Sequence, residues 1–199
     1  RTLEKVGGVD KFADGEEVKS VCFRDDTAYV CSAHGSFYLI NSVSVLDLSD
    51  PNRVTVKDNG SIKGYSTSLV ALPNGDFLGI GFDGGNRFLK VEVYRQTEDG
   101  VASVAVYQRP NISYVSNSRT FLIDRENGYF GIPIHDIGRH ESAFVLLSYD
   151  GERLTEQLTV PYETGSSNCV RGLLIDGYFY LFTWNGAFSA IPFPTGEPS

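Results

Sequence analysis

Short apolar stretches that flank a two-residue polar turn recur along this chain. The first lies within residues 18–32, where the apolar residues 21–23 and 28–31 flank Asp25 and Asp26. Two apolar stretches around a turn of two polar or glycine residues are typical of a β-hairpin. The same pattern returns three times, with turns at residues 74–75, 127–128 and 176–177.

A second hairpin follows each of the first three, so the repeating unit has four strands. The second turns lie at residues 50–52, 99–100 and 150–151, and Ser66, Ser116 and Ser166 stand 50 residues apart, each just before the first strand of its unit. Four short strands per repeat of about 50 residues are the signature of propeller blades. No segment has helical periodicity. The sequence therefore predicts an all-β fold, a β-propeller of about four four-stranded blades.

The repeat divides the chain into blades within a single propeller domain, or propeller segment, over residues 1–199. The first predicted part is an outer strand of a preceding or closing blade, at residues 1–13. Three complete blades follow, at residues 16–62, 66–108 and 116–160. A last blade without its fourth strand spans residues 166–193. If residues 1–13 complete the last blade, the chain closes into a four-bladed ring. If they do not, the chain is part of a larger propeller. The sequence leaves both arrangements open.

Composition narrows the classes of partner. Hydrophobic residues make up 41% of the chain and aromatic residues 13%, which is ample for a packed all-β body. The net charge of −8, spread without long runs of one sign, disfavours nucleic acid and anionic membranes as partners. No apolar run approaches the length that spans a bilayer, so no membrane insertion is expected.

Because the chain begins at Arg1 and contains no methionine, we expect that its start is missing and that a signal peptide can precede it.

The three cysteines, Cys22, Cys31 and Cys169, have no CxxC spacing, so neither a zinc site nor a disulfide framework is predicted. Cys22 and Cys31 fall in partner strands of the first hairpin and can form a disulfide only if the register places them opposite one another. Core thiols are the favoured interpretation. No metal and no cofactor is predicted.

Several segments, in order and with their spacing, carry a resemblance to a known family. They are residues 15–16, 20–21, 26, 28–30, 46–51, 64–67, 78–81, 121–124 with Gly128, and 132–134. The chain resembles the β-propeller domain at the C-terminus of secreted bacterial and archaeal proteins, a family without an established activity. The resemblance implies a secreted or cell-surface location, a propeller longer than four blades, and neighbouring domains or blades in a longer parent chain. Residues 41–44 depart from the family pattern by lengthening the approach to Asp47.

The candidate binding residues come from loops that a propeller gathers on one face. Loops from each second to third strand, and those that enter each first strand, surround the central channel, where ligands usually bind. The predicted ligand-binding residues are His34, Tyr65, Asp83, Arg119, His135, Asp136, Arg139, His140, Arg171, Trp184 and Asn185. Imidazoles and carboxylates suit acid–base chemistry or metal binding, but no HExxH or other ligand spacing is present. No catalytic or metal residue is therefore assigned.

Aromatic residues near these loops have two interpretations. Tyr65, Tyr114, Tyr162 and Trp184 can form a platform on which a sugar stacks, or they can pack between blades, which is the more common role.

The predicted function is that of an extracytoplasmic binding or interaction module for a glycan or protein ligand. A non-catalytic role is favoured over an enzymatic one, because the sequence contains no nucleophile motif and no nucleotide-binding motif. The first alternative is a secreted hydrolase or lyase that acts on extracellular polysaccharide, with acid–base residues among His34, Asp83, His135, Asp136 and His140. The second alternative is a structural scaffold for a neighbouring domain.

Overall fold

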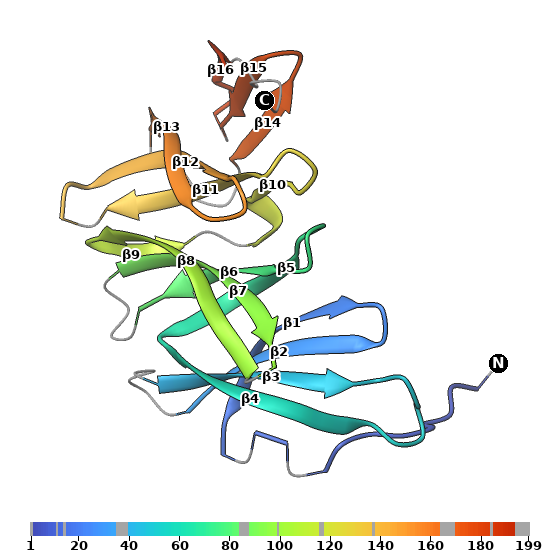
Figure 1. Cartoon of the computed structure of the whole chain (residues 1–199). Helices are drawn as coiled ribbons and strands as arrows, with labels where there is room; N and C mark the ends of the chain where they lie inside the picture. The colour runs from blue at the N-terminus through green and yellow to red at the C-terminus, as the bar shows by residue number, and fades with distance from the viewer. Residues whose placement is uncertain are drawn as a thin grey trace. The chain divides into compact units, whose positions relative to one another are not determined.

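The computed structural model is all-β and comprises two compact units, residues 1–110 and 111–199, called unit 1 and unit 2 below (Figure 1). It describes residues 2–10, 12–13, 15–34, 40–83, 88–98, 100–115, 118–136, 138–163, 170–183 and 185–193, without the side chains of residues 40–42, 58–63 and 113–115. Strands form wherever short apolar stretches alternate with turns, so the predicted fold class is confirmed. No helix among the described residues is long and apolar enough to cross a membrane.

Unit 1 contains two four-stranded antiparallel sheets, each in the order of its sequence. The first consists of β1 (Glu17–Arg24), β2 (Thr27–Ala33), β3 (Ile40–Asp47) and β4 (Thr55–Lys63). The second consists of β5 (Tyr65–Ala71), β6 (Phe77–Phe82), β7 (Phe88–Thr97) and β8 (Gly100–Pro110). These two sheets are the first two predicted blades.

Unit 2 contains a larger and a smaller antiparallel sheet. The larger has β10 (Leu122–Asp124), β11 (Tyr129–Asp136), β12 (Glu141–Tyr149) and β13 (Leu154–Tyr162) in order, and β9 (Ile112–Val115) also pairs with β11. A single 3₁₀ turn, η1 (Ser118–Thr120), separates β9 from β10. The smaller sheet has three described strands, β14 (Arg171–Ile175), β15 (Tyr178–Phe182) and β16 (Phe188–Pro192). Strand β9 is a feature that the repeat pattern did not indicate.

The hairpin turns lie where the sequence predicts them. Between β14 and β15, Asp176 and Gly177 both have positive φ values, 48° and 75°. A two-residue turn of this kind matches the twist of its flanking strands only with positive φ at both positions, which glycine and aspartate tolerate. Asp25 in the first hairpin and Gly75 in the third have positive φ as well, at 49° and 98°.

Residues 2–9 form no strand. Val9 and Phe12 instead pack against a buried cluster on the first sheet that includes Ala28, Val30 and Leu46. The expected outer strand of residues 1–13 is therefore not seen in the described part of that segment, and its place in a preceding or closing blade stays a prediction.

Cys22 and Cys31 are both buried, in agreement with the interpretation as core thiols, and no disulfide joins them to one another. Cys22 pairs across the hairpin with Tyr29, whereas Cys31 pairs with Ser20, so the register does not set the two cysteines opposite one another. Burial raises the pKa of the Cys31 thiol, and the Ser66 backbone N–H donates a hydrogen bond to its sulfur (3.3 Å). Cys169 lies outside the described residues.

Aromatic side chains hold the two sheets of unit 1 together. The Tyr29 ring of the first sheet stacks on Phe77 of the second with centroids 4.3 Å apart, and Phe77 contacts Tyr94 with centroids 5.2 Å apart. The Tyr29 hydroxyl also donates to Gln96 Oε1 (3.0 Å). Offset aromatic pairs of this kind stabilise a core beyond the apolar area that they bury.

A buried polar cluster lies on the same face of β7. Lys90 Nζ donates to Glu92 Oε2 at 2.5 Å, and the Tyr94 hydroxyl donates to the same carboxylate oxygen at 2.7 Å. Burial and the neighbouring Glu92 carboxylate raise the pKa of Tyr94 well above its ordinary value, so its hydroxyl keeps the proton. On β6, Gly79 and Gly81 pair with Glu92 and Lys90. Gly79 leaves room for the cluster, because a Cβ there would overlap the Ser66 hydroxyl and the Tyr94 ring, whereas a Cβ at Gly81 would overlap the backbone of Tyr65 and Ser66.

Unit 2 has its own core between its two sheets. Phe144 of the larger sheet meets Phe179 of the smaller one with ring centroids 5.5 Å apart. Leu122, Leu146, Val160, Val170 and Leu181 complete the buried cluster.

The opposite face of the smaller sheet exposes large apolar side chains. Strand register places alternate residues of β14, β15 and β16 on this face, among them Ile175, Tyr178, Phe182 and Phe188, each more than two-fifths exposed. The Phe182 and Phe188 rings contact one another with centroids 5.0 Å apart. Leu173, 45% exposed, lies on the same face.

Loss of one partner of the buried Lys90–Glu92 ion pair should lower the free energy of unfolding more than loss of both partners. In the Lys90→Met variant Glu92 keeps a charge with no cationic partner in a buried site, and we expect the free energy of unfolding to fall by about 3–5 kcal/mol. The double variant Lys90→Met/Glu92→Leu should lose less, because no charge stays buried. Urea denaturation of both variants measures the difference, and a double variant less stable than the single one would contradict it.

Asp47 should contribute to stability at neutral pH and lose that contribution in acid. Its Oδ1 accepts from the Ser49 backbone N–H (2.9 Å), and Lys57 Nζ lies 3.0 Å from Oδ2. Hydrogen bonds from Ser49, then from Lys57, lower the pKa of this carboxyl from 3.8 to about 2.

Because the folded-state pKa is depressed, the contribution is full above pH 3.8 and disappears as the pH falls through about 2. The Asp47→Asn variant should therefore unfold with a weaker pH dependence over this window in acid titrations followed by circular dichroism. Asp26→Asn, which removes another exposed carboxylate, is the control. An unchanged acid limb in Asp47→Asn would refute the expectation.

Candidate functional site

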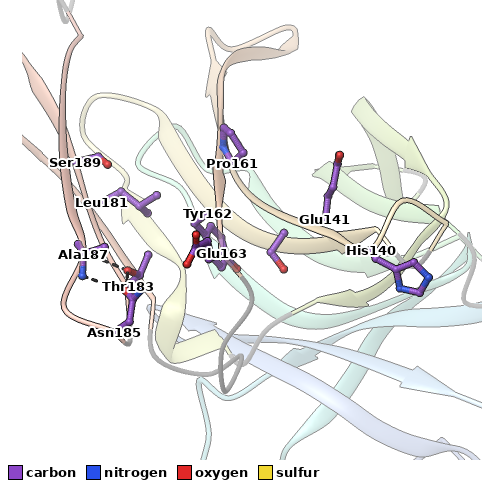
Figure 2. A pocket seen from close by; sticks show the side chains of 11 residues that line it. His140, Glu141, Pro161, Tyr162, Glu163, Leu181, Thr183, Asn185, Ala187 and Ser189 are labelled. Carbon is purple, nitrogen blue, oxygen red and sulfur yellow. Dashed lines mark hydrogen bonds between the residues drawn. The ribbon is translucent and has the colours of Figure 1, made fainter.

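Unit 2 contains a pocket of about 610 Å³ between its two sheets, called the β12–β16 pocket below. Figure 2 shows one wall built by residues from β15, β16 and the turn between them, and a facing wall built by residues from β12, β13 and the segments next to them. The lining residues are His140, Glu141, Ser142, Pro161, Tyr162, Glu163, Leu181, Thr183, Asn185, Ala187 and Ser189.

The register of the larger sheet brings one wall together. Ser142 of β12 pairs with Tyr162 of β13, so Glu141 and Glu163 each lie one residue beyond this pair at the same end of the sheet. His140 precedes β12 in a turn and has a positive φ of 55°. Residues about 20 apart in sequence therefore meet at one pocket wall.

The turn between β15 and β16 shapes the other wall. Asn185 Oδ1 accepts hydrogen bonds from the Thr183 hydroxyl (2.6 Å) and from the Ala187 backbone N–H (3.1 Å). The Thr183 backbone N–H donates to the Ala187 carbonyl (3.0 Å). Asn185 thus fixes this turn with its side-chain oxygen, and Figure 2 shows these residues at one end of the pocket.

The pocket combines an apolar part with acidic and hydroxyl groups. Leu181 is 2% exposed and belongs to the core of unit 2, and Tyr162 packs against the same core. Glu141 and Glu163 are exposed, and neither carboxylate has a hydrogen-bond or ion-pair partner among the described residues. The described lining residues thus include two acidic side chains and no lysine or arginine.

Two of the predicted site residues, His140 and Asn185, line this pocket. His135 lies next to it, because its Nδ1 is 2.9 Å from the hydroxyl oxygen of the buried pocket residue Ser142. Asp136 Oδ1 accepts a hydrogen bond from the Arg139 backbone N–H (3.1 Å), which stabilises the turn before β12. Both His135 and Asp136 thus have contacts that hold local structure.

Three predicted residues belong to unit 1. His34 is exposed, with its Nδ1 2.7 Å from the Gly15 carbonyl oxygen. Tyr65 is buried, and its ring packs against Phe82 with centroids 5.9 Å apart. Asp83 follows β6, and its buried Oδ1 has no hydrogen-bond partner in the part of the chain that the structure describes.

The remaining predicted residues of unit 2 are not lining residues of the β12–β16 pocket. Arg119 is exposed in η1. Arg171 lines a different groove of about 570 Å³ beside β10 and β14, together with Arg125, Asp124 and Glu126. This groove carries two positive and two negative side chains, so it has no net preference for one sign of ligand. Trp184 lies outside the described residues.

Sequence reasoning missed Glu141, Glu163 and Ser189, which lie at strand ends or within outer strands. Nothing in their spacing marks them as a group, because hairpin register and sheet packing bring them together. Tyr162 was noted as an aromatic candidate, and it does line the pocket. Among the described residues, no three His, Cys, Asp or Glu side chains are arranged to hold a metal ion.

Comparisons with known proteins agree with this fold. An uncharacterised protein of Archaeoglobus fulgidus is 26% identical over 180 residues, which cover 90% of this chain and 26% of that protein. An uncharacterised protein of Methanocaldococcus jannaschii is 26% identical over 184 residues, covering 91% of this chain and 27% of that protein. The chain therefore spans about a quarter of the length of these curated relatives.

Among solved structures, the computationally designed Ika4 protein matches with a TM-score of 0.57 at 9% identity, over 96% of this chain and 99% of that one. At this identity the likeness concerns the fold alone. The family model described as a beta propeller domain matches residues 1–189. With four successive antiparallel sheets and this match over nearly its whole length, the chain belongs to the beta propeller domain family.

Proposed function

We propose that this domain is an extracytoplasmic binding module and that its ligand enters the β12–β16 pocket. The observation that carries the proposal is the pocket itself, a hollow of about 610 Å³ whose walls come from two adjacent sheets. Concave sites with an apolar part and a few convergent polar groups are where proteins most often bind small molecules or single side chains of a partner.

The contacts around the pocket favour binding over catalysis. His135 contacts the Ser142 hydroxyl, and Asp136 accepts a backbone N–H within its own turn. Both groups, which the hydrolase or lyase alternative would use as acid and base, thus have partners that fix local structure. A binding module needs only the shape and the charge of the pocket.

Filling the pocket should abolish binding while the fold stays intact. Ser189 lines the pocket from β16, whereas the next residue, Ala190, pairs with Tyr180 and lies on the opposite face of the same strand. In a thermal-shift screen with short peptides and oligosaccharides, a ligand that raises the melting temperature of the wild type should not raise that of Ser189→Trp.

Ala190→Trp is the matched control, since it adds the same side chain one residue away, and it should keep the shift. The ligand site proposed here is wrong if Ser189→Trp responds to the ligand as the wild type does, or if neither class of compound shifts the wild-type protein.

The location outside the cytoplasm rests on the resemblance to domains of secreted proteins. We expect the native protein to be degraded when protease is added to intact cells of the source organism, while a cytoplasmic enzyme in the same cells survives. Protection of both proteins until the cells are lysed would contradict this expectation.

A further inference from the structure

We infer that the ligand of the β12–β16 pocket carries a positively charged amine or guanidinium group on an apolar stem, as a lysine or arginine side chain does. This inference rests on the proposed function of the pocket and specifies the chemistry of its ligand. Three features of the pocket support it, namely its apolar part, its charge and the arrangement of its acidic groups.

The apolar part of the pocket fits an alkyl stem. Leu181 extends from the β15 wall toward Tyr162 of the facing wall in Figure 2. Leu181 is held in place because it belongs to the buried cluster around Phe144 and Phe179. Burial of a methylene chain against such a surface favours the bound state, because it removes apolar area from water. Long basic side chains bind in this manner, with the stem on apolar surface and the charged head at a polar rim.

The charge of the pocket selects a cation. Among its described lining residues Glu141 and Glu163 are acidic, and none is lysine or arginine. The whole chain carries a net charge of −8, so its long-range field also favours approach of a cationic ligand. An anionic ligand would meet repulsion both at a distance and inside the pocket.

The end of the sheet next to the pocket is rich in acidic residues. Asp136 of β11 pairs directly with Glu141 of β12, and Glu163 follows β13 at the same end of the sheet. Asp136 is not a lining residue of the pocket, and its Oδ1 accepts a hydrogen bond from the Arg139 backbone N–H. The carboxylates available to a ligand of the pocket are therefore those of Glu141 and Glu163.

An organic cation fits this end of the sheet better than a metal ion. Within the described residues no three acidic, histidine or cysteine groups converge at metal-binding distances. Carboxylates that are spread along a pocket wall suit a hydrogen-bonding ammonium or guanidinium group, which has several donors pointing in different directions.

The test is a titration of the isotope-labelled chain with two capped tripeptides, monitored by nuclear magnetic resonance. The two peptides differ only in the terminal ammonium group of the central side chain. One is acetyl-Gly-Lys-Gly-amide, and the other has norleucine in place of lysine. The lysine peptide should shift the amide signals of Ser142, Leu181 and Ser189 with saturation, and the norleucine peptide should bind at least about threefold more weakly.

Charge-neutral variants then test the role of the carboxylates. The double variant Glu141→Gln/Glu163→Gln keeps the shape of both side chains, and it should weaken binding of the lysine peptide by about threefold to tenfold. Glu152→Gln, in the exposed turn between β12 and β13, removes one negative charge outside the pocket and should leave the affinity unchanged. Added salt should weaken binding to the wild type more than binding to the double variant.

Several results would overturn the inference. One is equal affinity for the lysine and norleucine peptides, and another is a double variant that binds the lysine peptide as the wild type does. If a neutral oligosaccharide saturates the same amide signals while the lysine peptide does not, the proposed function stands and the inference about charge falls. If neither kind of ligand affects the pocket signals, both fall.

Discussion

Each sheet of this protein can bury its apolar side chains only against a neighbouring sheet, because a single antiparallel sheet has two faces and no interior of its own. In unit 1 the Tyr29, Phe77 and Tyr94 rings fill the space between the two sheets. In unit 2 Phe144 and Phe179 do the same. This face-to-face packing sets where strand ends and turns come to lie, and the candidate pocket is built from those ends and turns.

The packing faces are not uniformly apolar. Lys90, Glu92 and Tyr94 form a buried hydrogen-bonded group on β7, and Gly79 on the adjacent strand provides its space. A buried ion pair adds little net stability, since desolvation of its charges offsets their attraction. Such a group does restrict which sheet can pack on β7, because any partner must leave both charges paired. Gly79 and the ion pair therefore depend on one another within unit 1.

The smaller sheet of unit 2 shows what happens to a face that is not covered. Its inner face contributes Phe179 and Leu181 to the core, whereas Tyr178, Phe182 and Phe188 on its outer face are partly exposed. Contiguous exposed aromatic surface of this kind is uncommon on monomeric proteins and marks a surface that gains stability from contact. The pocket lies on the inner side, so its walls are supported by the core and do not depend on how the outer face is covered.

The hairpin pattern alone determined the fold class, the four successive sheets and the positions of most turns, because a strand's apolar alternation and its glycine or aspartate turns are local properties. Local pattern also placed His140 and Asn185 in loops, and both line the β12–β16 pocket. It did not indicate β9, since four residues carry too little apolar pattern, and it did not foresee that residues 2–9 form no strand. Glu141, Glu163 and Ser189 became neighbours only through strand register and the packing of two sheets. Register depends on pairing along whole strands, and the contact between sheets depends on side chains far apart in sequence, so only the tertiary structure could decide which polar groups share the pocket.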